Sequence, residues 1–432
     1  MNRTKLRLIP ALIAIAFSGS AAAAGFQLLE QNASGLGNAY AGSAAVADNA
    51  STIFYNPAGM TQLKDIEVST GVSLVSASYK FNDNGSSTGA LSGNSDGGTD
   101  GYIPNAYLSW RVAKDISVGL GIGAPFGLMT DYNNPWYGAA QSDKFQIKTI
   151  NVNPSIAWRA NDWLSIGGGV NYQTIDAEYV RAVAITNGAL ATTTATLKLN
   201  DTAWGWNAGL LFTLNPATKV GVSYRSTIKY EVTGDVALSG PAAAALSAGG
   251  AASDVKASVK LPDTFILSGT HKFSDQWEVL GDLSWTGWSS IPKIDVIRTS
   301  GIASGQLAQR LDTEFRDSWR VAAGANYQLN EAWKLKFGVA YDQTPVKGAT
   351  TRLVSLPDND RVWFSIGTQW KPAKNTTIDV GATYLLIKDA DINNNQTVAV
   401  VDAATAAQNR GTVKGTYDDK AIILGAQLSM AF

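Results

Sequence analysis

The last eleven residues of the chain alternate between apolar positions and small or polar ones. The apolar side chains fall at every second residue and end on an aromatic carboxy-terminus: Ile422, Leu424, Ala426, Leu428, Met430 and Phe432. Between them the residues are small or polar, with Ile423 as the one exception. Because successive side chains of a strand point to opposite faces, this segment has one apolar face and one polar face. Such a pattern is typical of a transmembrane β-barrel, whose outer face contacts lipid and whose inner face lines a polar lumen.

Similar segments recur upstream and predict an all-β fold, a 14-stranded antiparallel transmembrane β-barrel. Short turns such as Asn161-Asp162 and Asn215-Pro216 alternate with long connections such as 82–100 and 389–410. Short turns at one rim and long loops at the other are the layout of outer-membrane barrels. The predicted strands lie near residues 66–82, 101–113, 115–128, 145–160, 163–186, 193–214, 217–238, 252–273, 275–297, 311–329, 332–347, 359–371, 376–389 and 411–432.

The predicted lumen face carries charges of both signs. Mixed signs favour ion pairs that hold the wall together over a single-sign field that selects ions. The charged positions on this face are Asp282, Arg320, Lys336, Asp342, Arg361 and Asp379.

Composition supports a membrane location and excludes several kinds of chemistry. Charged residues make up 16% of the chain, against about 25% in typical soluble domains. The chain has 0 cysteines, so disulfides and thiol-based metal sites are excluded, and its net charge of -1 gives no nucleic-acid signature. We expect no cofactor and no metal.

The amino terminus has the form of a secretory signal, predicted to span residues 1–24. Arg3, Lys5 and Arg7 precede a short apolar run, and Ala22 and Ala24 give small residues at the spacing of a cleavage site. A membrane-spanning helix would need about 20 apolar residues, which this run lacks. Cleavage after Ala24 would leave Gly25 as the first residue of the mature chain.

Residues 25–64 do not alternate and are predicted to form a plug inside a barrel made by residues 65–432. The segment combines small residues with Phe26, Tyr40, Phe54 and Tyr55. Disordered tails are depleted in aromatic residues, which argues against a tail. Small residues permit close packing against a barrel wall.

Several motifs give the whole mature chain a resemblance to one family. They are Gly25-Phe26-Gln27, the run from Ala33 to Gly42, Tyr55-Asn56-Pro57-Ala58-Gly59, Pro125-Phe126-Gly127-Leu128, Trp204-Gly205-Trp206-Asn207-Ala208-Gly209, Tyr224-Arg225-Ser226 and Leu356-Pro357-Asp358-Asn359-Asp360-Arg361-Val362-Trp363. With these motifs the chain resembles the FadL family of long-chain fatty-acid transporters of the Gram-negative outer membrane, which also includes channels for aromatic hydrocarbons.

The resemblance implies a monomeric, multi-pass outer-membrane barrel with an N-terminal hatch. Its hatch or gate residues would be Phe26, Asn56, Pro57 and Ala58, the last three lying against the wall near the third strand. Hydrophobic molecules would be captured outside and released sideways into outer-membrane lipid beside a kink in that strand.

The residues of the third strand allow such a kink. Gly121, Gly123, Pro125 and Gly127 fall within one predicted strand, and glycine and proline weaken strand pairing. From the residues alone, Pro125 fits equally well as the end of the strand before an extracellular loop. The resemblance favours the kink.

Candidate substrate-binding residues come from the fifth and tenth strands. Strand alternation places Ile175, Ala177, Tyr179 and Arg181 on the lumen side, unless a bulge near Thr174 reverses the register. Arg316 is expected to face inward as well, and the resemblance gives both arginines a role in binding a carboxylate, which an arginine fork can bind with two bonds. Alternatively, each arginine is a rim residue or pairs with a neighbouring acid, Glu178 or Asp317.

Two other classes of function compete with a hydrophobic transporter. An outer-membrane enzyme would need a nucleophile and a base, but the only histidine is His271 and no G-x-S-x-G motif is present. An open diffusion porin would have no use for the predicted plug. Long-chain fatty acids and aromatic hydrocarbons both fit an apolar slot; the arginines favour a carboxylate.

Overall fold

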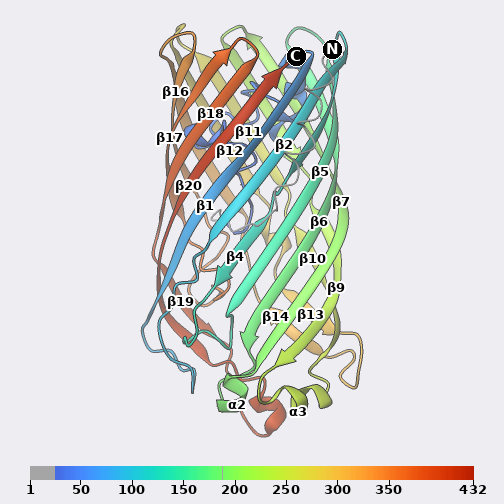
Figure 1. The fold of residues 1–432 in the computed structure, drawn as a ribbon, viewed down its shortest axis with the longest axis vertical. Coiled ribbons are helices and arrows are strands. Elements are labelled where there is room, and N and C mark those ends of the chain that lie inside the picture. Colours follow the sequence, from blue (N-terminus) through green and yellow to red (C-terminus); the bar gives the residue numbers. More distant parts are fainter. Residues whose placement is uncertain (1–24, 187) are drawn as a thin grey trace.

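The computed structural model describes residues 25–186 and 188–432 and shows a closed antiparallel β-barrel (Figure 1). The predicted signal, residues 1–24, lies outside the described residues. Among the described residues, no helix is long and apolar enough to cross a membrane.

The barrel has fourteen strands, as the alternation predicted. Eight strands are continuous: β1 (Ile66–Asp83), β2 (Asp100–Ala113), β5 (Lys144–Arg159), β6 (Leu164–Ala182), β7 (Thr194–Asn215), β16 (Trp333–Asp342), β17 (Arg361–Ala373) and β20 (Thr412–Ala431). Six are interrupted and consist of two segments each: β3 (Ile116–Gly123) with β4 (Gly127–Asp131), β8 (Thr218–Arg225) with β9 (Ile228–Ser239), β10 (Ser253–Leu261) with β11 (Thr264–Lys272), β12 (Trp277–Thr286) with β13 (Ile294–Arg298), β14 (Leu307–Leu311) with β15 (Ser318–Gln328), and β18 (Thr376–Ile387) with β19 (Ala390–Asn395).

The last strand closes the barrel against the first. β20 pairs with β1 from Glu67↔Ala431 to Asp83↔Gly415 and with β18 on its other side. Closure leaves no free sheet edge in lipid at this seam, where unsatisfied backbone groups would be costly. The alternation at the carboxy-terminus therefore reflects a strand with one lipid face and one lumen face.

The outer surface carries two groups of aromatic contacts. At the end with the short turns, Trp333 stacks on Trp370 at 5.6 Å, and Trp277 contacts Tyr327 at 4.8 Å. Towards the long loops, Trp206 contacts Tyr224 at 5.3 Å. Aromatic girdles of this kind mark the two membrane interfaces of outer-membrane barrels, with the short turns on the periplasmic side.

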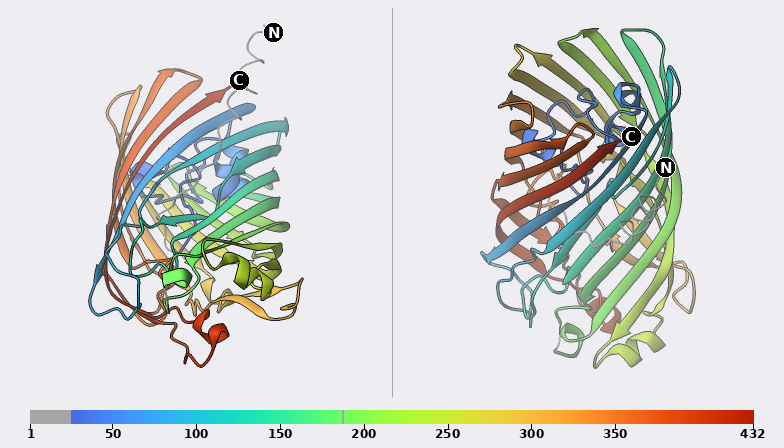
Figure 2. Two further views of the ribbon diagram at one scale, coloured as in Figure 1. Left: turned by 60° about the horizontal axis from the view of Figure 1, so that its bottom comes forward. Right: turned by 45° about the horizontal axis from the view of Figure 1, so that its top comes forward.

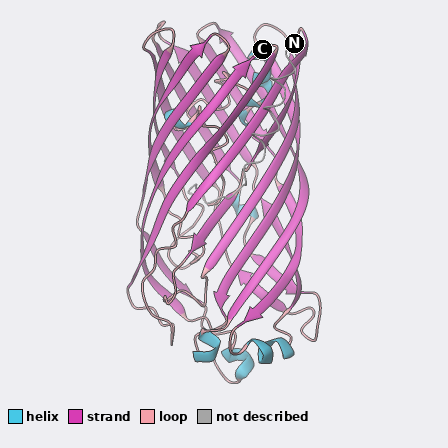
Figure 3. Cartoon of the chain, viewed as in Figure 1, coloured by secondary structure: helices cyan, strands magenta, loops and turns pink. Residues whose placement is uncertain are grey.

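The extracellular end carries short helices in its loops, shown in cyan at the bottom of Figure 3. Those loop helices are α2 (Gly188–Ala191), α3 (Ala243–Ala248) and α4 (Ala403–Ala406). The other helices within the described residues are η2 (Leu36–Asn38), α1 (Thr52–Tyr55) and η3 (Pro57–Gln62) in the N-terminal segment, and η4 (Trp288–Ser290) between β12 and β13.

The segment 25–64 lies inside the barrel, as the blue trace in Figure 2 shows. Wall glycines make room for it, because a Cβ atom on Gly221 would lie 1.9 Å from the carbonyl oxygen of Ala44, and one on Gly338 would lie 2.1 Å from Asn38. Polar side chains also fix the segment to the wall. Asn38 donates to the Phe337 carbonyl oxygen at 3.1 Å, and Asn56 donates to that of Leu210 at 2.9 Å.

One part of the expected arrangement differs in its detailed contacts. Asn56, Pro57 and Ala58 were predicted to lie near the third strand, but Asn56 bonds β7, and Ala58 approaches Gly167 of β6. The third strand is contacted by Ile53 and Met60, which flank these three residues and lie against Gly119, and at its kink by the start of the segment, around Phe26 to Gln31. Gly167 and Gly209 determine where Asn56 to Ala58 pack on the wall, because any larger side chain at these two positions would overlap those residues.

Three of the predicted lumen charges, Lys336, Asp379 and Arg361, are in ion pairs, as the mixture of signs indicated. Lys336 lies 2.8 Å from the Asp379 carboxylate and also donates to the Ser34 carbonyl oxygen at 2.7 Å. Arg361 pairs with Asp358. These buried contacts join wall strands to one another and to the N-terminal segment.

Candidate functional site

The third strand is interrupted between Gly123 and Gly127. β2 pairs with β3 from Ala113↔Ile116 up to Ala106↔Ile122, and beyond that point its residues 100–105 pair with β1 alone in the described ladders. β4 continues the third strand, but it pairs with β5. The wall thus lacks its regular ladder between β2 and β4.

The N-terminal segment takes the place of β2 at this interruption. The Leu28 amide donates to the Pro125 carbonyl oxygen at 2.8 Å, and the Gly127 amide donates to the Phe26 carbonyl oxygen at 2.9 Å. The Gln31 side chain makes two further bonds to the Ala124 backbone, at 2.7 and 3.1 Å. The segment inside the barrel therefore supplies hydrogen-bond partners for the backbone of the kink. Because of these bonds, a movement of the segment would also displace the kink.

An apolar cavity lies on the extracellular side of this contact. The predicted residues Ile175, Ala177 and Tyr179 line it, so the lumen register predicted for β6 is the one observed. Its few polar lining residues are Tyr179, Gln309, Thr313 and Ser355, and its apolar lining includes Phe145, Leu197, Val232, Leu311, Phe315 and Leu356. The apolar lining of this cavity suits an alkyl chain or a hydrocarbon ring.

Aromatic rings close the inner end of the apolar cavity. Phe26 lies 4.7 Å from Trp288 and 6.1 Å from Phe126, and Trp288 lies 5.8 Å from Phe315, measured between ring centroids. Trp288 is fully buried. Phe26 lines the apolar cavity, whereas Phe126 and Trp288 line a second cavity, so this cluster separates the two spaces.

Arginines stand at the outer end of the apolar cavity, in an open groove of about 2530 Å³. Arg181 is buried, and its guanidinium donates to Gln309 at 3.1 Å and to the carbonyl oxygens of Ala182 and Val183 at 2.9 Å. Among the described residues, no carboxylate lies within ion-pair distance of Arg181 or of Arg410, which lines the same groove. Burial lowers the pKa of the Arg410 guanidinium. An anion in the groove would offset the cost of keeping these charges away from water.

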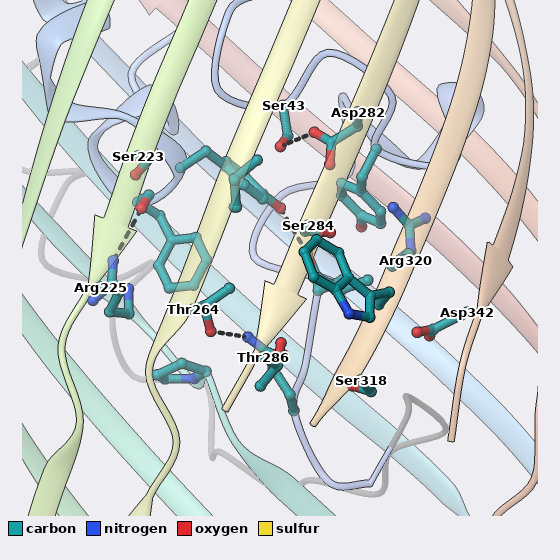
Figure 4. A pocket seen from close by; sticks show the side chains of 18 of the residues that line it. Ser43, Ser223, Arg225, Thr264, Asp282, Ser284, Thr286, Ser318, Arg320 and Asp342 are labelled. Atoms are coloured by element: carbon teal, nitrogen blue, oxygen red, sulfur yellow. Dashed lines mark hydrogen bonds between the residues drawn. The ribbon is translucent and has the colours of Figure 1, made fainter. Parts of the chain in front are cut away.

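The second cavity lies between the aromatic cluster and the N-terminal segment. Figure 4 shows Asp282, Ser284 and Thr286 along β12, with Ser43 directed at Asp282. Arg320 and Asp342 come from the neighbouring strands β15 and β16. Pro125 and Phe126 also line this cavity, so it reaches the interruption of the third strand. Its polar wall contrasts with the apolar cavity beyond the rings.

The prediction that Arg316 faces inward is wrong. Its side chain is 39% exposed, lies 3.7 Å from Asp360 and donates to the Thr344 carbonyl oxygen. Asp360 also accepts from Tyr341, whose ring lies on the exposed outer face. Because β15 begins only at Ser318, strand alternation does not extend back to Arg316. Ser318, the first residue of β15, does face inward and lines the second cavity.

Sequence reasoning missed Trp288, Asp358 and Arg410. Trp288 and Arg410 lie outside the strands, where no periodicity assigns a direction. Asp358 belongs to the family motif Leu356 to Trp363, but the motif did not indicate which residue Asp358 contacts. His271 hydrogen-bonds Thr218 near the end of β11, and the described residues contain no group of His, Asp and Glu suited to a metal ion.

Comparison with known proteins assigns this chain to a family. The family described as "Outer membrane protein transport protein (OMPP1/FadL/TodX)" matches residues 14–432. The chain belongs to this family. It is 30% identical over 456 residues to Outer membrane protein P1 of Haemophilus influenzae and 29% identical over 443 residues to the long-chain fatty acid transport protein of Salmonella typhi; each alignment covers 96% of both proteins.

Solved structures of similar fold cover nearly all of the chain. The crystal structure of a Pseudomonas aeruginosa FadL homologue has a TM-score of 0.84 at 20% identity, covering 94% of this chain and 99% of that one. A toluene transporter, TodX of Pseudomonas putida, has a TM-score of 0.68 at 14% identity, covering 93% and 98%. The family members are transport channels, so this FadL/TodX-family chain is an outer-membrane transporter of hydrophobic molecules and not an enzyme.

Proposed function

We propose that this protein takes up long-chain fatty acids across the outer membrane and releases them sideways at the interruption of the third strand. The observation that carries the proposal is the apolar cavity whose open end meets Arg181 and Arg410. A fatty acid has the matching form, an alkyl chain that ends in a carboxylate. Charge-assisted bonds from an arginine fork are stronger than neutral ones and would hold the carboxylate at the mouth.

The route follows the order of the cavities. The groove at the extracellular end would admit the molecule, and the apolar cavity would hold its chain against Phe26. Displacement of Phe26 would strain the bond between its carbonyl oxygen and the Gly127 amide, so binding would loosen the contact that satisfies the kink. The molecule would then enter the second cavity and leave beside Pro125 into lipid.

Fatty-acid binding to an Arg181→Gln variant tests the carboxylate site. Losing a charge-assisted bond costs about 1.5–3 kcal/mol, or about tenfold to a hundredfold in affinity. Binding of an uncharged hydrocarbon of equal length should change little. Arg310→Gln is a matched control, because Arg310 lines the same groove but is already paired with Asp295 at 2.5 Å.

The outcomes separate the candidate substrates. Equal weakening of both ligands would mean that Arg181 shapes the cavity and does not hold a carboxylate. An aromatic-hydrocarbon channel would bind toluene as tightly as oleate and would be insensitive to the charge at position 181. An open diffusion porin would show steady ion conductance in a planar bilayer, whereas the filled lumen of this chain should show little.

A further inference from the structure

Two lysines face each other on the outer surface of the barrel. Lys229 in β9 and Lys260 in β10 are direct cross-strand partners. Their neighbours Ile228 and Leu261 are buried on the lumen side, so strand alternation places both ammonium groups on the outer face. Directly opposite side chains on one face have Cβ atoms about 4.5–5.5 Å apart.

The carboxylate of Glu231 lies near this pair, but the two lysines are not in ion pairs with any described residue. Among the described residues, neither ammonium makes a hydrogen bond or ion pair, whereas Lys144 lies 2.6 Å from Glu178. Glu231, which shares the face two residues from Lys229, accepts the Ser258 hydroxyl at 2.8 Å. Like charges directly opposite each other destabilise a sheet unless an anion lies between them.

The pair lies at the extracellular membrane interface. The Trp206 amide donates to the Ser226 hydroxyl at 2.9 Å, so Trp204 on β7 and Lys229, three residues beyond Ser226, are at nearly the same height. Trp204 is 65% exposed and contacts Tyr172 at 5.0 Å, as expected of an interfacial girdle. Lipid headgroups occupy this height.

We propose that Lys229 and Lys260 together bind a phosphate group of an outer-leaflet lipid. A phosphate oxygen cluster can accept from both ammonium groups at once and removes their mutual repulsion. The apolar girdle next to the pair suits the acyl chains of the same molecule. This site is on the outer wall, separate from the cavities of the transport route, and it does not rest on the proposed substrate.

The full chain, reconstituted in phosphatidylcholine vesicles with diphosphorylated lipid A, tests the site. The measurement is the affinity for lipid A, from native mass spectrometry of the extracted barrel. Each lysine near an anionic surface contributes about fivefold in affinity, so Lys229→Gln with Lys260→Gln should lose about 25-fold. Replacing both lysines by arginine should restore binding. The matched control is Lys371→Gln with Lys374→Gln, two exposed lysines at the periplasmic rim.

Several results would overturn the proposal. Unchanged lipid A binding by the double glutamine variant would show that the pair is not the site. Equal affinity for dephosphorylated lipid A would exclude the phosphate, and equal affinity for inorganic phosphate alone would exclude a lipid as the source. Failure of the double glutamine variant to fold would show in the control measurement of heat-modified mobility, and single variants would then give the fivefold steps.

Discussion

The backbone nitrogen of Gly25 lies 2.9 Å from the Asp358 carboxylate, deep inside the barrel. Asp358 is itself held by Arg361 and by the Thr344 hydroxyl at 2.5 Å. If the signal is removed after Ala24, this nitrogen becomes the terminal ammonium of the mature chain, and the contact becomes a buried ion pair. This ion pair at the chain terminus would thus hold the neighbouring Phe26 at the inner end of the apolar cavity.

Weakening this contact should release Phe26 from its place. For Asp358→Asn we expect faster hydrogen exchange at the Leu28 and Gly127 amides and a roughly tenfold weaker affinity for oleate, since the charge that holds Gly25 and Arg361 is removed and Phe26 is no longer fixed. Asp360→Asn is the control, because Asp360 bonds Tyr341 and Thr344 and does not contact Gly25. Unaltered exchange at Leu28 and Gly127 in Asp358→Asn would contradict the anchoring role.

The seat of the N-terminal segment depends on small wall residues. We expect Gly221→Ala to raise ion conductance and the rate of proteolysis within residues 25–64, because its Cβ atom would lie 1.9 Å from the Ala44 carbonyl oxygen. Gly281→Ala, in the wall strand β12, is the matched control, since no atom lies within 4 Å of its Cβ position. If Gly221→Ala and the control had the same ion conductance and the same rate of proteolysis, the segment would be able to accommodate the extra methyl group without loosening.

Blocking the wall beside the third strand should stop release. Asn105 is buried just past the last pair of the β2–β3 ladder, and its side-chain amide bonds no other described residue. We expect Asn105→Trp to reduce oleate uptake at least tenfold in cells while leaving oleate binding intact. Leu108→Trp, on the lipid-exposed face of the same strand, should leave uptake unchanged. Normal uptake by Asn105→Trp would place the exit elsewhere.

The buried pair of Lys336 and Asp379 should matter more to stability than a partly exposed one. Asp379→Ala leaves the Lys336 ammonium buried without its carboxylate, which costs about 3–5 kcal/mol in the free energy of unfolding. Glu178→Ala breaks the pair with Lys144, whose side chains are 25–27% exposed, and should cost less than about 1 kcal/mol. Urea unfolding in lipid vesicles measures both, and equal costs would refute the distinction.

Alternation along single strands was enough to predict most of the wall. Ile175, Ala177 and Tyr179 line the apolar cavity as the period of two required, because β6 runs without a break from Leu164 to Ala182. Arg181 lies at the end of the same strand and follows the same rule. Arg316 does not, because it precedes the first residue of β15, and a local pattern says nothing about residues outside regular structure.

The sequence by itself determined the strand number, the two faces, the length of the segment inside the lumen and the weak point around Pro125, because these follow from local periodicity and backbone chemistry. Only the tertiary structure decided which wall strands receive Asn56, that Gln31 and Leu28 satisfy the interrupted strand, and that Trp288 and Arg410 complete the cavity ends. Those contacts join residues about a hundred or more positions apart, and they depend on barrel closure and on the depth to which the segment packs, which no local pattern encodes.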